Sequence, residues 1–342
     1  MGESVITTYS GCTISTDLST ITPTGNPITQ ETIQTSSFDQ YGNALAQTVY
    51  TQYYDTTPGA NQNTFQFSSY QAISNNTYDL HNRLLSSTVD NYSDQGKTFT
   101  SRELITDSNY DVYGNAVNQV VNTYNSTTAT TANLVNSQVI VNQYGNVTAA
   151  FFHHATTSTV SKYNTDVTAS QSLSTMIDQT VTNTTSFDTL GNALTQTTDK
   201  FVASLGSLVQ TTHMDITNSG YDGRGDASSQ SIATYNIDGA VKTLVSYQVF
   251  TDRTYDSNHE VTNQMVLTYA DLAGTTLLDC QEIRSSGFTA SGVATNQVIV
   301  TYLDQTEKSI IDVKTITNSD ISSTGNVGES VITTYASAKD TC

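Results

Sequence analysis

Residues 110–124 read YDVYGNAVNQVVNTY, and this stretch holds the pattern that decides the fold. An aromatic residue is followed by Asp111, and a Gly-Asn pair comes after two variable positions. Gln119 stands five residues after the glycine, and Tyr124 stands ten residues after it. Asp, Gly and Asn favour tight turns, whereas Val, Thr and Tyr favour strands. The stretch therefore predicts a turn followed by a β-strand.

The same pattern recurs along the chain and marks a structural repeat. When the glycine position of each copy is taken as its anchor, the last five anchors are 34, 34, 33 and 33 residues apart. Asn82 and His259 replace the glycine in two copies, and Asn is the non-glycine residue that most readily takes the left-handed conformation of a turn. The residues predicted to form the turns are Asp39, Gly42, Asn43, Asp79, Asn82, Asp111, Gly114, Asn115, Gly145, Asp188, Gly191, Asn192, Asp222, Gly225, Asp256, Gly292 and Gly325.

Each repeat unit carries a second turn signal about half a period after its anchor. Asp238-Gly239, flanked by β-forming residues, is such a hairpin signal. Each unit of about 33 residues is thus two strands and two turns, and the chain predicts about twenty strands in an antiparallel meander. Because an open twisted sheet seldom exceeds about ten strands without curling or splitting, we expect this ribbon to coil into a solenoid, a tube or a shell.

The predicted fold class is therefore all-β, a repetitive antiparallel meander in a single elongated domain over residues 1–342. It contains about nine to ten units. The repeat is irregular around residues 1–41 and 146–186. In the second of these stretches the interval from Gly145 to Gly191 widens to 46 residues, which indicates an inserted loop or a degenerate unit.

The strand that follows each anchor does not alternate cleanly. The seventh residue after the anchor is usually apolar, the ninth is often Thr and the tenth is usually Tyr. The seventh and tenth positions of a regular strand point to opposite faces. Either a bulge disturbs the register or the sheet is partly covered on both sides.

The Gln and Tyr residues that recur in the strands are expected to be structural. If the units lie one over another, the amides stack as a hydrogen-bonded ladder and the Tyr rings stack likewise. Binding of a glycan to the Tyr and Asn side chains is the alternative. The predicted ladder residues are Gln119, Gln196, Gln230, Gln264, Gln297, Tyr124, Tyr235, Tyr269, Tyr302 and Tyr335.

The two ends of the chain match. The string GESVITTY occurs without a mismatch at residues 2–9 and 328–335. In a meander that does not close, each end presents an unpaired edge, so one end can pair with the other end of the next copy and generate a head-to-tail polymer. The alternative partner is the neighbouring repeat of a longer covalent array. The expected assembly residues are Gly2, Val5, Ile6, Tyr9, Cys12, Gly328, Val331, Ile332 and Cys342. Either Cys12 and Cys342 form a bond between neighbouring copies, or all three cysteines are unpaired thiols without a role.

Composition excludes several classes of function. The 342 residues include 12 basic and 31 acidic side chains, a formal net charge of -19, so we expect no nucleic-acid partner, which would demand a basic face. Charged residues are only 13%, while there are 61 Thr and 20 Tyr, a composition that favours sheet over helix. The sequence has no run of 18 or more apolar residues, and therefore no predicted membrane span.

Candidate chemistry is sparse. The sequence contains no nucleophile elbow, phosphate-binding loop or H-E-x-x-H motif, so we expect no enzyme activity. His153-His154 could bind a transition metal, but adjacent strand residues point to opposite faces, which favours a structural role. The turn aspartates are expected to cap their own turns by accepting backbone N–H bonds. Calcium between successive turns is the alternative for them, since acidic oxygen-rich loops suit a hard cation.

The Y-D-x-x-G-N element resembles the YD repeat of the rearrangement-hotspot proteins, which are bacterial surface and toxin-delivery proteins, and of the related teneurins. The resemblance is carried by Tyr110-Asp111 with Gly114-Asn115 and by Tyr221-Asp222 with Gly225. It implies a long β-ribbon that spirals into a shell or cocoon, an extracellular setting and no catalytic residue. The period of about 33 residues departs from the family's shorter repeat.

These observations predict an extracellular structural protein, an array-forming subunit of a surface fibre, stalk or sheath. Two alternatives accompany this prediction. One is a surface adhesin that binds glycans. The other is a segment of a YD-type shell that encloses a toxin.

Overall fold

A computed structural model describes residues 2–14, 21–55, 62–94, 98–167, 172–256, 259–289, 291–321 and 325–336. These residues form nineteen β-strands, the short helix α1 (Val147–Phe151) and the 3-10 turn η1 (Thr131–Asn133).

The strands are β1 (Gly2–Ile14), β2 (Ile21–Phe38), β3 (Ala44–Asp55), β4 (Thr64–Tyr78), β5 (Leu84–Tyr92), β6 (Phe99–Tyr110), β7 (Ala116–Tyr124), β8 (Leu134–Gln143), β9 (Thr157–Tyr163), β10 (Met176–Phe187), β11 (Ala193–Ser204), β12 (Ser207–Tyr221), β13 (Ala227–Asp238), β14 (Val241–Tyr255), β15 (Val261–Tyr269), β16 (Leu277–Phe288), β17 (Ala294–Tyr302), β18 (Ile310–Ser319) and β19 (Glu329–Ala336).

The sheet is a single antiparallel meander, in which every strand pairs with the next one along the chain from β1–β2 to β18–β19. This confirms the predicted all-β class and the antiparallel meander. The described parts of β1 and β19 pair only with β2 and β18, so the sheet does not close into a barrel, and these two strands are its edges.

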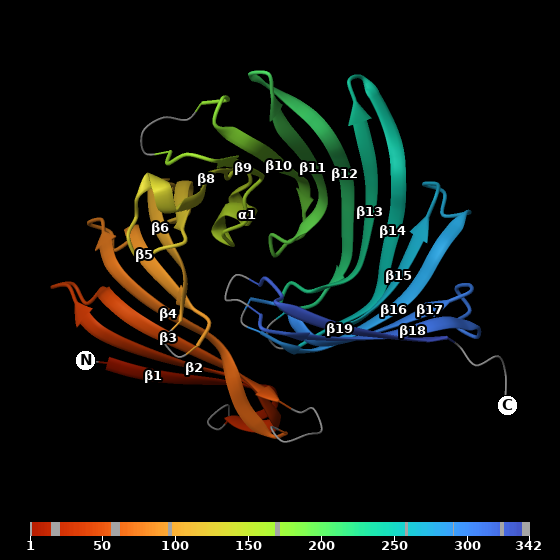
Figure 1. The fold of residues 1–342 in the computed structure, drawn as a ribbon, viewed down its shortest axis with the longest axis horizontal. Helices are drawn as coiled ribbons and strands as arrows, with labels where there is room; N and C mark the ends of the chain where they lie inside the picture. Colours follow the sequence, from red (N-terminus) through yellow and green to blue (C-terminus); the bar gives the residue numbers. More distant parts are fainter. Residues whose placement is uncertain are drawn as a thin grey trace.

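The sheet curves strongly, so that its first and last strands lie at the same end of the molecule (Figure 1). At that end β3 contacts β16 without pairing with it. A cavity of about 500 Å³ lies between them, lined by Tyr53 and Tyr54 on one side and by Gly287 and Phe288 on the other. The ribbon therefore returns to itself where β3 and β16 lie close together without a hydrogen-bonded ladder.

A two-sided cover accounts for the mixed strand pattern, and the bulges lie beside it, in the strand that follows. In seven pairs of strands the register shifts at the ninth and tenth positions after the anchor, as between Thr234 and Tyr235, where β14 inserts the extra residue Val245. Val266 and Tyr269, the seventh and tenth residues after one anchor, are 7% and 6% exposed, so both faces of β15 are covered.

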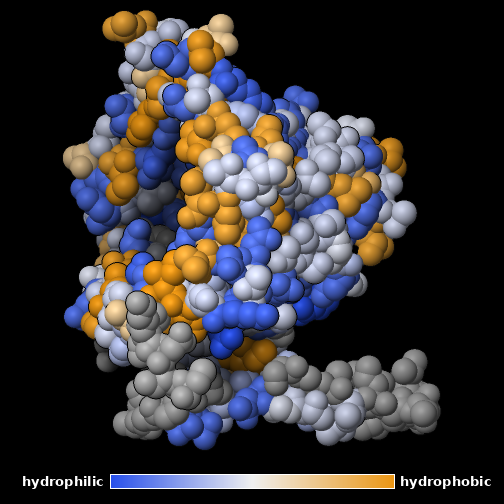
Figure 2. All heavy atoms as spheres, turned by 90° about the vertical axis from the view of Figure 1, so that its right-hand side faces the viewer, coloured by the Kyte–Doolittle hydropathy of each residue, from blue (hydrophilic) through white to orange (hydrophobic). Residues whose placement is uncertain are grey.

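The apolar core is small for a chain of this length. The accessible surface is 18593 Å², whereas a compact protein of 36.9 kDa exposes about 13,600 Å². One cluster contains Met265, Cys280 and Tyr302. Figure 2, which views the molecule from the side of β13 to β18, shows apolar side chains scattered among hydrophilic ones on the surface. The sheet therefore depends on its backbone ladder and on polar contacts more than a two-layered protein does.

Candidate functional site

The repeat turns share one construction, and the turn at Asp111 shows it. Oδ1 of Asp111 accepts hydrogen bonds from the backbone N–H groups of Tyr113 and Asn115, both at 2.8 Å. Oδ2 accepts from the Asn115 side-chain amide at 2.8 Å, and the N–H of Gly114 donates to the Asp111 carbonyl at 3.2 Å. Gly114 has a φ of 86°, which a residue with a Cβ adopts only at a cost. The D-x-x-G-N order thus encodes one hydrogen-bonded turn.

The other anchors repeat these bonds with small changes. Asp39 and Asp188 bind the following Asn in the same way, while Arg83 takes the place of the Asn beside Asp79. Asn82 and His259 have φ angles of 61° and 66°, which confirms the positive φ expected at the glycine position. The remaining predicted turn residues lie in equivalent turns at Asp222 with Gly225, at Asp256 with His259 and at Gly292. Gly325 has a positive φ of 82°, and the three residues before it lie outside the described residues.

The hydrogen bonds hold the turn carboxylates in their ionised form. The side chain of Arg83 lowers the pKa of Asp79 to about 2, and the backbone N–H of Thr275 lowers the pKa of Asp271 to about 2 in a hairpin turn at the other edge of the ribbon. The Asn43 side chain likewise lowers the pKa of Asp39.

We therefore expect the protein to lose stability on acidification chiefly between about pH 4 and about pH 2. A carboxylate with a lowered folded-state pKa contributes its full stability above its unfolded value of 3.8 and loses it as the pH falls through the folded value. Circular dichroism melting curves across this range measure the effect, and the double variant D79N/D271N should show a shallower fall. A melting temperature that stays constant throughout would contradict the expectation.

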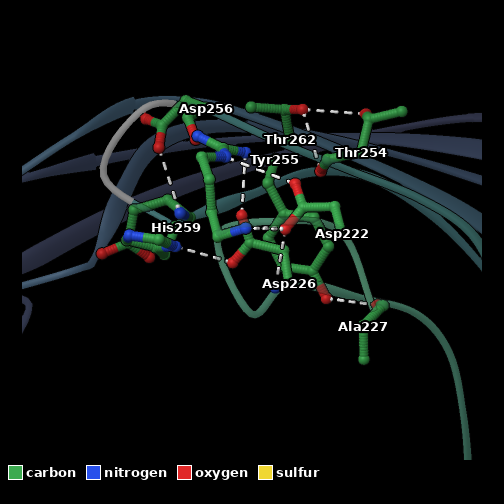
Figure 3. A network of polar contacts seen from close by, with 10 residues as sticks. Asp222, Asp226, Ala227, Thr254, Tyr255, Asp256, His259 and Thr262 are labelled. Atoms are coloured by element: carbon green, nitrogen blue, oxygen red, sulfur yellow. Dashed lines mark hydrogen bonds and ion pairs between the residues drawn. The ribbon is translucent and has the colours of Figure 1, made fainter. Parts of the chain in front are cut away.

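Where a Tyr precedes the turn aspartate, its hydroxyl ties one hairpin to the preceding one. Tyr255 donates to the carbonyl of Ala227 at 2.7 Å, and Tyr221 donates to the carbonyl of Ala193 at 2.5 Å (Figure 3 shows the first pair). In both cases the acceptor lies two residues after the previous anchor. This bond therefore links two consecutive repeat units through a side chain, in addition to the pairing of their strands.

The variant Tyr255→Phe should destabilise the region by about 1 kcal/mol, because the ring still packs but the Ala227 carbonyl loses a donor. Urea unfolding followed by circular dichroism measures the change. Tyr41→Phe is the matched control, since Tyr41 is 67% exposed and should leave the midpoint unchanged. Equal midpoints for the two variants would show that the Tyr255 hydroxyl contributes nothing.

Successive turns also bind one another, and together they form a row along one edge of the ribbon. We call it the turn row, defined by the anchors Gly42, Asn82, Gly114, Gly191, Gly225, His259, Gly292 and Gly325. Asn43 donates to Asn82 at 2.9 Å, and the Arg83 guanidinium lies 4.6 Å from the centroid of the Tyr110 ring in the next unit. Side chains therefore connect turns that are about one repeat apart in the sequence.

The most charged part of the turn row surrounds Asp226 (Figure 3). The side chain of Asp226 is only 6% exposed, and it contacts Arg224 at 2.8 Å and Nδ1 of His259 at 2.7 Å. Arg224 also donates to the Asp256 carbonyl at 2.9 Å. A buried carboxylate thus has two basic partners, one of them from the neighbouring turn.

Helix α1 takes the place of one turn in the row. Asn146 caps it by accepting the N–H of Ala149 at 2.9 Å. Ala149 and Ala150 are buried at 0% and 2% exposure, and the Ala150 carbonyl accepts the Asn115 amide at 2.8 Å. The prediction that Gly145 forms a repeat turn is therefore wrong, because Gly145 precedes a helix and does not have a positive φ.

His153 and His154 lie at the end of this helix and not in a strand. Nδ1 of His153 is 2.5 Å from the Asn115 side chain, and Nδ1 of His154 is 2.5 Å from the Gly191 carbonyl. The argument from opposite strand faces does not apply to them. The two imidazoles instead link the turns on either side of α1, which the sequence could not show because the partners are 38 and 37 residues away.

The recurring Gln side chains bind the preceding strand and do not form an amide-to-amide ladder. Gln230 donates to Asn218 at 2.8 Å, and Gln47, Gln119, Gln196 and Gln297 make equivalent bonds twelve residues back. Gln264 accepts from Arg253 at 3.1 Å, and the same Arg253 contacts Gln230 at 3.2 Å. Cross-strand neighbours are closer than equivalent residues two strands apart, which is why the ladder prediction fails.

Most of the recurring Tyr rings are buried or covered and so are not accessible to a glycan. Tyr124, Tyr269 and Tyr302 are 2%, 6% and 9% exposed. Tyr235 packs under Lys242, with 3.8 Å between the ammonium nitrogen and the ring centroid. Tyr335, on β19, is 55% exposed.

The predicted assembly residues lie on the two edge strands where the structure describes them. Val5 and Ile6 of β1 are 55% and 52% exposed, and Val331 and Ile332 of β19 are 55% and 60% exposed. Gly2 and Tyr9 belong to β1, and Gly328 immediately precedes β19. The backbone of Cys12 pairs with Pro23, while Cys342 lies outside the described residues.

A titratable cluster that the sequence did not reveal surrounds His213. Its Nδ1 is 2.6 Å from Asp199, and its Nε2 is 2.9 Å from Asp215. Lys242 lies 3.4 Å from the other Asp215 oxygen. Burial raises the pKa of Asp215, but the bonds from His213 and Lys242 lower it overall. Three strands, β11, β12 and β14, contribute to this cluster, so no local motif marks it.

Among the residues that the structure describes, no group of three or more His, Cys, Asp or Glu side chains is arranged to hold a metal ion, so the calcium alternative gains no support there. The thiol of Cys280 is free and buried in the core. No helix in the described ranges is long and apolar enough to span a membrane.

Of the comparisons with known proteins, the one with solved structures finds matches, and these are distant. No family model and no curated protein matches the sequence. Two of the matching solved structures are the Photorhabdus luminescens Tc holotoxin pore with a mutated TccC3 chain, at 11% identity and a TM-score of 0.15, and the crystal structure of TcdB2-TccC3, at 10% and 0.16. Each match covers 89% of this chain and 20% of the other, so this chain spans about a fifth of the proteins it matches.

Proposed function

We propose that this chain is a structural β-ribbon that forms part of the wall of an extracellular shell. The observation that carries the proposal is the contact between β3 and β16, through which the ribbon returns to itself without closing a hydrogen-bonded barrel. A ribbon that curves in this way and keeps both edges open can continue to wind, and successive coils build a curved wall.

The turn row supports the same role. Its hydrogen bonds join several successive hairpins, which stiffens this edge of the ribbon. The turn aspartates and the recurring Gln residues are occupied by these structural bonds. A structural role therefore explains the repeated motif without any catalytic step.

Small-angle X-ray scattering and negative-stain electron microscopy of the purified chain test this proposal. A flat sheet of nineteen strands would be about 90 Å wide across its strands, whereas a curved one is shorter in that direction and yields discrete particles of uniform size. A scattering profile that fits a flat or extended ribbon would contradict the proposal.

A self-assembling fibre is the second candidate, and the matching edge strands favour it. The string GESVITTY forms most of β19 and much of β1, and both copies expose their apolar side chains. Uniform fibres in the same micrographs would support this candidate over an isolated wall segment.

A further inference from the structure

The structure contains two different binding sites for one strand sequence. As β1, the string GESVITTY pairs with β2, where Ile6 is opposite Glu31 and Val5 is opposite Thr32. As β19, the same string pairs with β18, where Ile332 is opposite Ile316. Each copy of the string thus has a partner on one side only, and the two partners are on opposite sides in the order of the meander.

The GESVITTY strand runs in the same direction in both sites. Strands alternate in an antiparallel meander, so β1 and β19 run the same way and β2 and β18 run opposite to them. A single GESVITTY strand can therefore lie between a β18 and a β2 and pair with both. Its side-chain contacts are preserved as well, because Gln30 donates to Thr7 at 3.1 Å in one site and Ser330 donates to Asn318 at 2.7 Å in the other.

We propose that β19 of one copy docks on β2 of a second copy in the place of β1, and that β1 of one copy can equally dock on β18 of another. The predicted register follows from the 326-residue offset, with Ile332 opposite Glu31 and Val331 opposite Thr32 of the second copy. This inference deepens the self-assembly candidate by naming the partner as a second copy and fixing the pairing.

Docking between copies is favourable only if it increases the number of paired strands. Two separate copies contain the β18–β19 pairing of one and the β1–β2 pairing of the other, which makes two ladders. After docking, β19 pairs with both β18 and β2 while β1 is released, which again makes two ladders. The intact chain therefore gains nothing from exchange, whereas a chain with one end strand disabled gains a whole ladder.

Proline variants of the full chain test this condition. I6P/T7P disables β1, because the N–H groups of adjacent residues alternate in direction and one of the two faces β2. I332P/T333P disables β19 at the equivalent positions. Each variant alone should associate at least about tenfold more tightly than the intact chain in sedimentation velocity, since one additional net hydrogen bond already approaches a factor of about ten.

The variant that combines all four prolines is the decisive control, because it has free sites on β2 and β18 but no competent strand to fill them. It should sediment as a single chain. Non-specific aggregation of exposed edges predicts the reverse, with the fourfold variant at least as associated as either double variant, and that result would overturn the proposal. Hydrogen exchange in β10 to β14 checks that each variant keeps the rest of the sheet.

The register is tested by disulfide trapping in the I6P/T7P background. The pairs E31C/I332C and T32C/V331C cover both kinds of antiparallel position, so mass spectrometry should find an intermolecular bond in at least one of them. T32C/I332C is displaced by one residue, places its thiols on opposite faces and should not form a bond. Bonding in the displaced pair alone would overturn the proposed register. Scattering from the intact chain, which tests the curved wall, is independent of all these outcomes.

Discussion

The variant Arg102→Ala should destabilise the region around β5 and β6 by about 2–4 kcal/mol. Nε and Nη2 of Arg102 each bind one oxygen of Asp90 at 2.6 Å, and these side chains are 23% and 12% exposed. The guanidinium also donates to the carbonyl of Thr127. Removing it leaves a largely buried carboxylate without its cation, which costs far more than the pair itself contributes.

Each strand of this sheet contacts chiefly its neighbours, so the effect of Arg102→Ala should be local. Hydrogen–deuterium exchange in β5 and β6 is therefore the appropriate measurement. Arg284→Ala is the matched control, because Arg284 binds Glu282 at 2.7 Å but is 63% exposed, and its loss should cost less than about 1 kcal/mol. Equal exchange in both variants would show that the burial of the Asp90 pair is unimportant.

The variant Gly191→Val should cost about 2–5 kcal/mol, the sum of a backbone penalty and a packing penalty. Gly191 has a φ of 80°, which a β-branched residue avoids. A Cβ at this position would lie 3.1 Å from Phe152 and 3.4 Å from the backbone of Ala149 in α1. The valine must therefore displace the helix from the turn row.

Gly114→Val separates the two contributions. Gly114 has a φ of 86° and occupies the same position in its own turn, but a Cβ there meets nothing within 4 Å. We expect this variant to show the backbone penalty alone, about 1–2 kcal/mol. Urea midpoints measure both variants, and the difference between them reports the packing of α1. Equal midpoints would mean that α1 moves away freely.

The local construction of the protein could be predicted because its bonds are short in sequence. The hydrogen bonds that close the Asp111 turn lie within five consecutive residues, so D-x-x-G-N is enough to specify it. The antiparallel meander follows, since each hairpin joins strands that are adjacent in the chain. The same order makes the two GESVITTY strands the first and last of the meander.

The predictions that were wrong concern contacts between residues that are far apart in the sequence. The amide ladder assumed that equivalent Gln residues meet, whereas a side chain such as Gln230 reaches its cross-strand neighbour first. Gly145 fits the turn spacing, but the residues after it form a helix because Asn146 supplies a cap and the turns at Asn115 and Gly191 supply contacts. Those contacts come from segments more than 30 residues away, and spacing alone does not reveal them.

The sequence by itself determined most of the repeat turns and the pairing order of the strands, because these depend on neighbours along the chain. Only the tertiary structure decided that β3 meets β16, that His213 joins Asp199 and Asp215, and that Arg102 and Asp90 form a buried pair. These contacts depend on how far the sheet curves and which faces it covers. Curvature accumulates from the small twist of every strand and bulge, so it is a property of the whole ribbon.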